Sequence, residues 1–448
     1  MNKNSVGIFA IVTNMGLLSL LLPQSASGAE FYVAPNGKDT NAGTIALPFE
    51  TPQRAQEAAH PGDTVYLRGG VYAVREDQIA RRQGNYAYVF EMNKSGEPEK
   101  PIKYWAYQTE TPVFDFSQVK AEGLRIVAFY VSGSRIHFKG FGVKGVQVTI
   151  KTHTQSECFE NQGSNNIYER LSMHDGQAIG FYLLNGSNNL VLNCDAYRNH
   201  DFTSENGRGG NTDGFGAHPR KGATGNVFRG CRAWFNSDDG YDCINSAEAV
   251  TFENCWAFYN GFSDAFKSLG DGNGFKGGGY GSTPVGRLPT PIPRHVIRFC
   301  LAVRNKANGF YANHHIGGGD WFNNTAYRNP TNFNMLERLA DNVTDVPGTD
   351  QKMKNNLGYK GGKEVANLTA EKSDVTGNYF NLPVQVADND FLSLEEKELI
   401  EPRQPDGSLP KISFLHPAKG SDLIDKGADV GFPFKGAKPD LGCFESGY

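Results

Sequence analysis

A six-residue pattern that returns along the chain constrains the fold more than any other feature of the sequence. Each copy has Cys or Asn first, Ala third, an aromatic or apolar residue fourth and Asn sixth. Copies, including a weaker one at each end, start at residues 171, 194, 231, 255, 300, 324 and 356, so the shortest steps are 23 and 24 residues. A unit this short cannot bury its own apolar face. The units must therefore stack into a solenoid. The full copies are Cys194–Asn199, Cys231–Asn236, Cys255–Asn260, Cys300–Asn305 and Asn324–Asn329.

The residues within each unit are typical of β-strands, because apolar positions alternate and Val, Phe, Tyr and Thr lie between Gly and Asn turns. We therefore expect an all-β solenoid in which equal positions of neighbouring coils lie about 4.8 Å apart. The repeated Asn then forms a ladder at a turn. Four of the seven cysteines form an inward column, either of core thiols or with a disulfide between adjacent coils. These are Cys194, Cys231, Cys255 and Cys300.

The two ends of the chain differ from the repeats. Thr51 and Pro52 predict a short helix that runs to about Ala59 and caps the open end of the solenoid. After about residue 365 the repeat fades, which indicates irregular final coils or a small C-terminal cap.

The first 29 residues are predicted to be a signal peptide. Lys3 supplies positive charge, Ile8 to Leu22 is mostly apolar, and small residues follow from Ser25 to Ala29. We therefore expect residues 30–448 to form one secreted or periplasmic domain, monomeric and free of the membrane once the signal is cleaved. The formal charge of −4 argues against nucleic acid as a partner, since that needs a basic surface.

A second motif, a Gly-aromatic pair, follows the Asn turn in five units. Stacking these units aligns Ile, Asp, Asp, Asn and Asn at the first position, and Tyr, Gly, Asp, Lys and Tyr at the fourth. Long insertions between residues 199 and 213 and between 260 and 273 fall in the same coils, as expected for loops that border a cleft. The five segments are Ile179–Tyr182, Asp213–Gly216, Asp239–Asp242, Asn273–Lys276 and Asn308–Tyr311.

This alignment gathers four carboxylates, those of Asp213, Asp238, Asp239 and Asp242, on two coils. Such a group repels itself unless it is protonated or binds a cation. Oxygen ligands without His or Cys favour Ca²⁺ over zinc or copper. The alternative is that Ser237–Asp242 is an ordinary solvated turn, which is common for Asp and Gly.

Lys276 is the other unusual residue, because it lies one coil from Asp242 within the glycine-rich segment GNGFKGGG. The glycines let a bulky ligand approach the backbone closely. Its alternative role is an ordinary surface lysine that pairs with Asp242.

The motifs NCDAYRN, NTDGFG, GCRAWFNSDDGYD, NCWAFYNG and GNGFKGGG, within residues 193–279, resemble family 9 polysaccharide lyases. This is the pectate lyase group, which is built on a right-handed parallel β-helix. The resemblance extends over most of the mature chain. It implies calcium binding by Asp213, Asp238, Asp239 and Asp242, and a catalytic base at Lys276. It also implies β-elimination of a galacturonate-containing pectic polymer to 4,5-unsaturated ends.

The segment Ala312–Ile316 departs from the pectate-cleaving members, which have an Asn-rich turn there. The chain after residue 350 is more similar to the rhamnogalacturonan-cleaving relatives. Polygalacturonate and rhamnogalacturonan I are therefore both candidate substrates. We expect Tyr311, His314 and His315 to line a substrate subsite that helps to choose between them.

Two other classes of function remain. A polygalacturonase-type hydrolase shares the β-helix, and Asn211–Asp213 with Asp238 and Asp239 resembles its acid pair, but its Gly-His-Gly and Arg-x-Lys motifs are missing from the following coils. A non-catalytic glycan-binding solenoid accounts for the fold but not for the aligned Asp and Lys positions.

Overall fold

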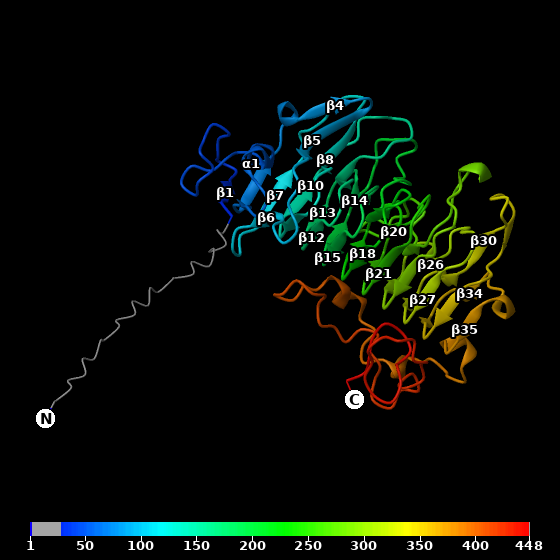
Figure 1. The fold of residues 1–448 in the computed structure, drawn as a ribbon. Coiled ribbons are helices and arrows are strands. Elements are labelled where there is room, and N and C mark those ends of the chain that lie inside the picture. The colour runs from blue at the N-terminus through cyan, green and yellow to red at the C-terminus, as the bar shows by residue number, and fades with distance from the viewer. Residues whose placement is uncertain (2–27, 448) are drawn as a thin grey trace.

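The computed structural model describes residue 1 and residues 28–447. Its strands, which lie between residues 30 and 376, form a parallel β-helix (Figure 1). The predicted signal peptide falls almost entirely outside the residues that the structure describes. Each coil contributes strands to three long sheets, and the pairings within the body of the solenoid are parallel. The predicted fold class is confirmed. In the described residues, no helix is both long enough and apolar enough to cross a membrane.

The first sheet has 12 strands. Their bounds are β1 Glu30–Val33, β2 Thr64–Leu67, β6 Ile102–Ala106, β9 Ile136–Lys139, β12 Ile167–Glu169, β15 Leu190–Leu192, β18 Asn226–Arg229, β21 Val250–Glu253, β24 Val296–Arg298, β27 Asp320–Phe322, β32 Lys352–Lys354 and β35 Asp374–Thr376. The second sheet has 10 strands. These are β3 Gly70–Ala73, β7 Pro112–Asp115, β10 Gly142–Lys144, β13 Ser172–His174, β16 Asp195–Tyr197, β19 Arg232–Trp234, β22 Trp256–Phe258, β25 Leu301–Val303, β28 Thr325–Tyr327 and β33 Leu357–Tyr359.

The third sheet, which positions the candidate site, has 11 strands. They are β4 Arg81–Gln83, β5 Tyr86–Met92, β8 Arg125–Val131, β11 Glu157–Asn161, β14 Ile179–Leu183, β17 Phe215–Ala217, β20 Tyr241–Asp242, β23 Phe275–Lys276, β26 Asn308–Tyr311, β29 Thr331–Asn334 and β34 Lys363–Ala366. A separate antiparallel pair follows β29 and consists of β30 Leu336–Arg338 and β31 Asp345–Pro347.

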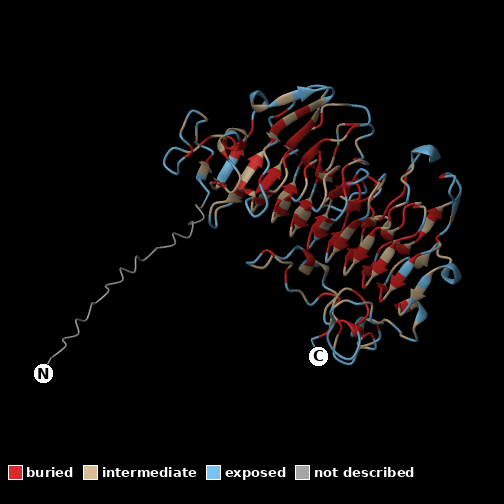
Figure 2. Ribbon diagram, viewed as in Figure 1, coloured by how far each residue is buried: buried red, intermediate tan, exposed pale blue. Residues whose placement is uncertain are grey.

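The core is a column of stacked side chains inside the three sheets, and buried residues line the inner faces along the whole solenoid (Figure 2). On the third sheet the aromatic residues of the Gly-aromatic pairs stack from coil to coil. Ring centroids are 5.0 Å apart for Phe215 and Tyr241, 4.6 Å for Tyr241 and Phe275, and 5.1 Å for Phe275 and Phe310. The aromatic residue of each pair therefore faces inward, and its neighbours in the strand face outward.

The repeated asparagines form the predicted ladder. Asn199 Nδ2 donates to Asn236 Oδ1 at 3.1 Å, and Asn236 Nδ2 donates to Asn260 Oδ1 at 3.1 Å. The ladder continues to Asn305 and Asn329 at 3.0 and 3.1 Å, and all five side chains are buried. Each Asn thus satisfies its neighbour in a place that water does not reach.

The Gly and the Ala that recur with this Asn along the chain have a steric cause. A Cβ atom on Gly240 would lie 2.9 Å from Ala257 Cβ, 2.9 Å from Asn260 Nδ2 and 2.7 Å from the Gly274 carbonyl oxygen. A Cβ atom on Gly214 or Gly274 would likewise lie 2.8 to 3.2 Å from the Ala and the Asn of the next coil. The Gly of each coil therefore packs against the Ala and the Asn of the coil that follows it.

The cysteine column lies beside this ladder. All seven cysteines are free thiols, and six of them are buried. Cys194 Sγ donates to the Tyr168 carbonyl at 3.3 Å, and Cys231 Sγ donates to Val191 O at 3.4 Å. Of the two alternatives, the core thiols are the ones that the structure contains.

A short helix closes the N-terminal end, as predicted. Helix α1, Pro52–Ala58, begins after Thr51, whose side chain accepts the Arg54 N–H at 3.1 Å. Gln56 is buried under the first coils, where its side-chain oxygen accepts the N–H groups of Asn93 and Lys94. Its polar side chain ties the helix to the end of the sheet.

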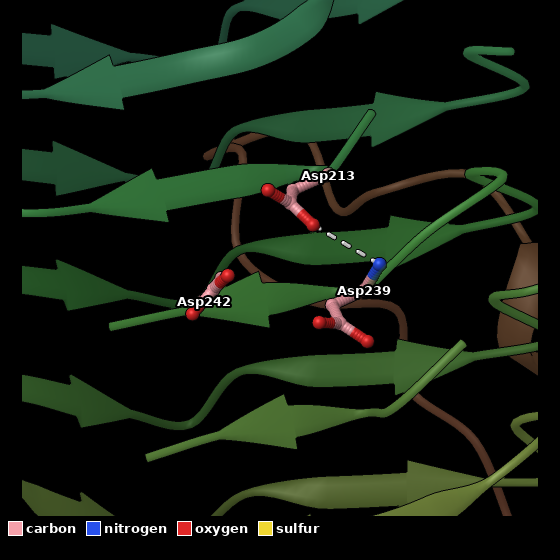
Figure 3. A group of neighbouring side chains, drawn as sticks. All are labelled: Asp213, Asp239 and Asp242. Atoms are coloured by element: carbon pink, nitrogen blue, oxygen red, sulfur yellow. Dashed lines mark hydrogen bonds between the residues drawn. The ribbon is translucent and has the colours of Figure 1, made fainter. Parts of the chain in front are cut away.

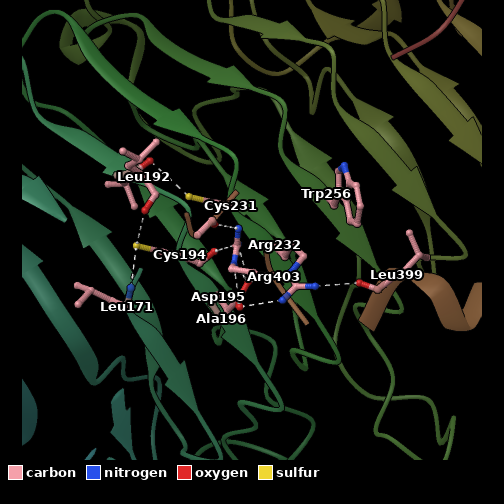
Figure 4. A network of polar contacts seen from close by, with 12 residues as sticks. Leu171, Leu192, Cys194, Asp195, Ala196, Cys231, Arg232, Trp256, Leu399 and Arg403 are labelled. Carbon is pink, nitrogen blue, oxygen red and sulfur yellow. Dashed lines mark hydrogen bonds and ion pairs between the residues drawn. The ribbon is translucent and has the colours of Figure 1, made fainter. Parts of the chain in front are cut away.

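The chain beyond β35 runs back along the outside of the second sheet instead of adding coils (Figure 1). Arg232 of β19 donates to the carbonyls of Leu399 and Glu401, and Asp195 of β16 pairs with Arg232 at 2.9 Å and with Arg403 at 2.7 Å (Figure 4). We call residues 377–447 the C-terminal strap. The short 3₁₀ helices of the chain are η1 Glu76–Gln78, η2 Val285–Arg287, η3 Ala370–Lys372, η4 Tyr379–Asn381, η5 Asp388–Asp390 and η6 Glu396–Ile400.

The ladder predicts a large effect of Asn260→Ala on stability. The substitution leaves the backbone N–H of Asn236 and one of the two Nδ2 hydrogens of Asn236 without an acceptor, and it removes the side-chain donor to the Ala233 carbonyl. We expect the free energy of unfolding to fall by at least about 2 kcal/mol, because each buried unsatisfied group costs about 1–3 kcal/mol. Denaturant unfolding measures this. The exposed Asn85→Ala is the control, with a change within about 0.5 kcal/mol. Equal effects of the two substitutions would contradict the ladder's role.

The ion pairs of the strap predict a dependence of stability on acid. Burial raises the pKa of Asp195, but Arg403 and Arg232 outweigh it, and the pKa lies below its ordinary value. The stabilisation is therefore present above the unfolded pKa of about 3.9 and is lost as the pH falls below it. Asp195→Asn should lower the free energy of unfolding by roughly 3–5 kcal/mol at neutral pH, since it leaves buried arginines unpaired. The free energies of unfolding of the variant and of wild type should become more similar below about pH 4.

Denaturant midpoints measured from neutral to acid pH test this prediction. Glu57→Gln is the control, because its pair with Arg54 is exposed, and we expect it to change the free energy by less than about 1 kcal/mol at any pH. If the difference in the free energy of unfolding between wild type and Asp195→Asn stays constant down to pH 2, the charge of the carboxylate is not what holds the strap.

Candidate active site and cation site

The third sheet brings the predicted residues into one line. Gly216 of β17 is paired in register with Asp242 of β20, Asp242 with Lys276 of β23, and Lys276 with Tyr311 of β26. The alignment of the fourth positions made from the sequence is therefore correct. Because the aromatic residue before each of them faces the core, these side chains face outward.

Three of the four predicted aspartates meet at one point. A carboxylate oxygen from each of Asp213, Asp239 and Asp242 lies within 4.8 Å of the others (Figure 3). All three side chains are buried. The fourth, Asp238, lies outside this group of three but lines the same cleft as Asp213 and Asp242.

The four carboxylates share one hydrogen-bonding pattern. In each of them Oδ1 accepts a backbone N–H, from Asp239 to Asp213 at 3.1 Å and from Ile244 to Asp242 at 2.7 Å. Asp239 Oδ1 accepts from the N–H of Asn273 at 2.6 Å, and Asp238 Oδ1 accepts from Asp271 at 3.0 Å. One oxygen of each group is therefore fixed by the coil structure, and Oδ2 is the atom that remains for another partner.

Lys276 reaches into this cluster. Its Nζ lies 3.1 Å from Asp239 Oδ2 and 3.1 Å from Asp242 Oδ2, and 14% of its side chain is exposed. The ammonium lies within ion-pair distance of Asp239 Oδ2 but away from a good hydrogen-bonding direction, so this buried oxygen accepts no hydrogen bond from the described residues. A lysine on one coil and two aspartates on the next therefore share one polar pocket.

Burial and like charge together set the ionisation of the cluster. Burial raises the pKa of Asp213, Asp238 and Asp239, and the charges of the neighbouring aspartates raise it further. Burial lowers the pKa of Lys276, but the four aspartates outweigh this, so the pKa lies well above its ordinary value. One lysine neutralises only one of these charges. The buried Oδ2 of Asp239, which accepts no hydrogen bond from the described residues, and the all-oxygen donor set fit a hard cation such as Ca²⁺.

An open cleft with a volume of about 460 Å³ is lined by Asp213, Asp238, Asp242 and Lys276. It is also lined by residues that the sequence analysis did not propose as site residues, including Tyr182, His218 and Arg220. His218 Nδ1 donates to the Ile244 carbonyl at 2.6 Å, and its ring lies 4.8 Å from that of Tyr182. Tyr182 was already in the aligned column, so the sequence held a signal for it. His218 and Arg220 follow β17 and carry no repeat.

The three predicted subsite residues have different environments. Tyr311 and His314 are partly exposed on the far side of Lys276 from the cleft, and His314 Nδ1 contacts Asp345 at 2.7 Å. His315 is buried with 1% exposure. Its Nδ1 accepts the N–H of Gly279 at 3.1 Å and its Nε2 donates to the Pro293 carbonyl at 2.8 Å. Direct contact between His315 and a polymer does not fit this burial; the ring supports the glycine-rich segment after Lys276.

The fold and the site together define a parallel β-helix protein with a buried acidic cluster and a lysine on one outer face. Residues 31–356 match the family described as the Pel9A-like, right-handed β-helix region. The chain belongs to this family.

The relatives agree with this assignment. Pectate lyase L of Dickeya chrysanthemi is 34% identical over 93% of this chain and 90% of its own length. Pectate lyase PEL9 of Emericella nidulans is 30% identical over 88% of this chain and 94% of its own. Among solved structures, a rhamnogalacturonan lyase is 47% identical with a TM-score of 0.84, covering 88% of this chain and 97% of its own. Pectate lyase Pel9A is 31% identical with a TM-score of 0.75, covering 94% and 97%.

Proposed function

We propose that this protein is a secreted, calcium-dependent polysaccharide lyase that cleaves a galacturonate-containing pectic polymer by β-elimination, with Lys276 as the base. Its family and its relatives, which are named as pectate and rhamnogalacturonan lyases, support this assignment. The observation that carries the proposal is the position of Lys276 Nζ, 3.1 Å from two carboxylates of an outward-facing acidic cluster. Neither a hydrolase acid pair nor a binding surface requires a lysine in that place.

In the proposed reaction Lys276 Nζ takes the proton from C5 of a uronate residue. The C5–H electron pair forms the C4–C5 double bond, and the bond from C4 to O4 breaks. The departing oxygen leaves with its electron pair and takes a proton from solvent. The products are a new chain end and a 4,5-unsaturated uronate. A base fixed in position typically contributes about 10²–10⁴-fold in rate.

Asp213, Asp239 and Asp242, with Asp238 beside them, would hold the calcium ion. Ca²⁺ bound there would supply positive charge that stabilises the charge developing on the sugar carboxylate. Asp239 and Asp242 pair with the lysine ammonium in this structure. A cation held by these carboxylates would weaken the ion pairs that hold the pKa of Lys276 high, and burial of Lys276 lowers the same pKa. This favours the neutral amine that a base requires.

Rhamnogalacturonan I is the second candidate substrate. The 47% identity to a rhamnogalacturonan lyase exceeds the 31% and 34% identities to Pel9A and to pectate lyase L, and this difference favours it. Tyr311 and His314 are the residues that we propose to help in the choice, because they lie on the coil next to Lys276 and are partly exposed.

The proposed chemistry predicts a specific product and a requirement for calcium. Wild-type protein should release products that absorb ultraviolet light, as unsaturated uronates do, from polygalacturonate or rhamnogalacturonan I. A chelator should abolish this release. Asp239→Asn should lose activity that excess calcium partly restores, because Asn keeps the Oδ1 acceptor for Asn273 and removes only the anionic oxygen. Calorimetric titration should show weaker calcium binding.

Asp264→Asn is the matched control, since this carboxylate is exposed, lies in the insertion between residues 260 and 273 and makes no hydrogen bond or ion pair with the four aspartates. We expect it to retain activity and calcium affinity. Reducing ends without ultraviolet absorbance would indicate hydrolysis. Full activity in chelator would exclude the calcium site as part of the mechanism.

Lys276→Ala should lower turnover by at least ~10²–10⁴-fold while calcium and polymer still bind. Lys276→Arg should not rescue it, because a guanidinium stays protonated and cannot accept the proton. Single-turnover rates and calorimetric binding separate the two effects. Near-normal activity of Lys276→Arg would mean that the residue only supplies charge.

A further inference from the structure

The outward column that holds Lys276 continues past the candidate site toward the N-terminus. From Asp242 it passes through Gly216 and Tyr182 to Glu160 of β11 and Tyr130 of β8, each paired in register with the next. Tyr130 is in turn paired with Glu91 of β5. Five coil-to-coil steps separate β23 from β8 in the third sheet. At about 4.8 Å a step, Tyr130 lies ~24 Å from Lys276 along one face.

Three tyrosines gather at this N-terminal end of the column. The rings of Tyr86 and Tyr88 are 5.7 Å apart and nearly parallel at 8°, and those of Tyr88 and Tyr130 are 4.4 Å apart. All three are partly exposed, whereas Phe90 and Phe129 of the same strands face the core and are buried. We call Tyr86, Tyr88 and Tyr130 the tyrosine platform.

Charged side chains hold the platform in place. Arg81 lies over Tyr88 at 4.2 Å from the ring centroid and pairs with Glu91 at 2.9 Å. Arg125 donates to Tyr86 Oη at 3.1 Å. Arg81 and Arg125 restrict the ring positions, so little side-chain freedom remains to be lost on binding. Arg81 lies over one face of Tyr88 and, at 5.4 Å from the ring centroid, over one face of Tyr130. Its charge is balanced by Glu91, so the platform presents ring edges and hydroxyl groups around a neutral ion pair. Such surfaces suit sugar rings, which combine apolar faces with hydroxyl edges.

We propose that the tyrosine platform is a distal subsite, which binds sugar rings of the polymer about five residues from the bond that is cleaved at Lys276. This inference rests on the proposed function, because it takes the polymer that reacts at Lys276 as the occupant. The continuity of the outward column supports that occupant: one sugar ring is close in length to one coil, so an extended chain seated at Lys276 runs along the column and over the tyrosines. The platform therefore gives the enzyme a preference for long chains.

The double variant Tyr88→Ala/Tyr130→Ala tests the platform. It is assayed on the polymer that wild type cleaves and on a tetrasaccharide of the same polymer. We expect KM for the polymer to rise about tenfold with kcat unchanged, since each aromatic contact contributes about 0.5–1.5 kcal/mol. Activity on the tetrasaccharide, which is too short to reach from Lys276 to Tyr130, should not change. The proposal would be overturned if kcat/KM fell equally on the polymer and on the tetrasaccharide, or if KM for the polymer did not change.

Tyr66→Ala is the matched control, because Tyr66 is a partly exposed tyrosine of the N-terminal coils on the first sheet. It should leave KM for the polymer unchanged. If the double variant unfolds, Tyr88→Leu/Tyr130→Leu keeps the apolar contact and removes the flat rings, and the same kinetic result is expected.

Affinity for the polymer can be measured directly by calorimetric titration. The polymer is titrated into the Lys276→Ala protein, with and without the platform substitutions. Affinity for the polymer should fall when the tyrosines are replaced, and unchanged affinity would overturn the platform. This readout does not need turnover. If wild-type protein forms no unsaturated product, the proposed function is refuted. The platform proposal is tested separately, because a lower affinity for the polymer after the tyrosine substitutions would still show that the platform binds sugar.

Discussion

The structure depends on how closely each coil packs on the next at the Asn turn. The Asn side chains bond to one another along the ladder, and this requires a Gly beside them, because a Cβ atom at the Gly would collide with the amide and with the Ala of the same repeat. The Ala and the Asn of one coil and the Gly of the coil before it meet in one small volume. The inward aromatic residue that follows the Gly then stacks on its counterparts in the neighbouring coils. One steric constraint thus sets the register of the third sheet.

That register creates the candidate site. Once the coils are aligned, a residue placed after the Gly-aromatic pair on one coil must lie beside the equivalent residues of the coils before and after it. An acidic cluster and a lysine can therefore be built from separate coils without any change in the scaffold. The backbone N–H groups at the turns hold one oxygen of each aspartate, so the remaining oxygens are fixed in direction before any ligand arrives. Such preorganisation is what a cation site and a positioned base both require.

The site is electrostatically costly for the folded protein. Burial and mutual repulsion raise the pKa of three aspartates, and one lysine offsets only part of the charge. Like charges buried together are common at functional sites and rare elsewhere, because they lower stability unless a ligand compensates them. The strap on the second sheet is the opposite case: Asp195 is balanced by Arg232 and Arg403 and needs no ligand.

The sequence by itself determined the repeat, the fold class, the Asn ladder and the alignment of Lys276 with Asp242, because each depends on periodic positions that stacking must bring together. It also indicated the capping helix, through Thr51 and Pro52. Only the tertiary structure decided which oxygen of each aspartate the backbone N–H groups hold, that Asp238 stands apart from the group of three, and that His315 is buried behind Gly279. It alone brought His218 and Arg220 into the cleft and laid the strap along the second sheet. These features rest on contacts between segments up to about two hundred residues apart, such as Arg403 with Asp195. Contacts of that kind follow from the three-dimensional path of the chain, and no local or periodic pattern encodes them.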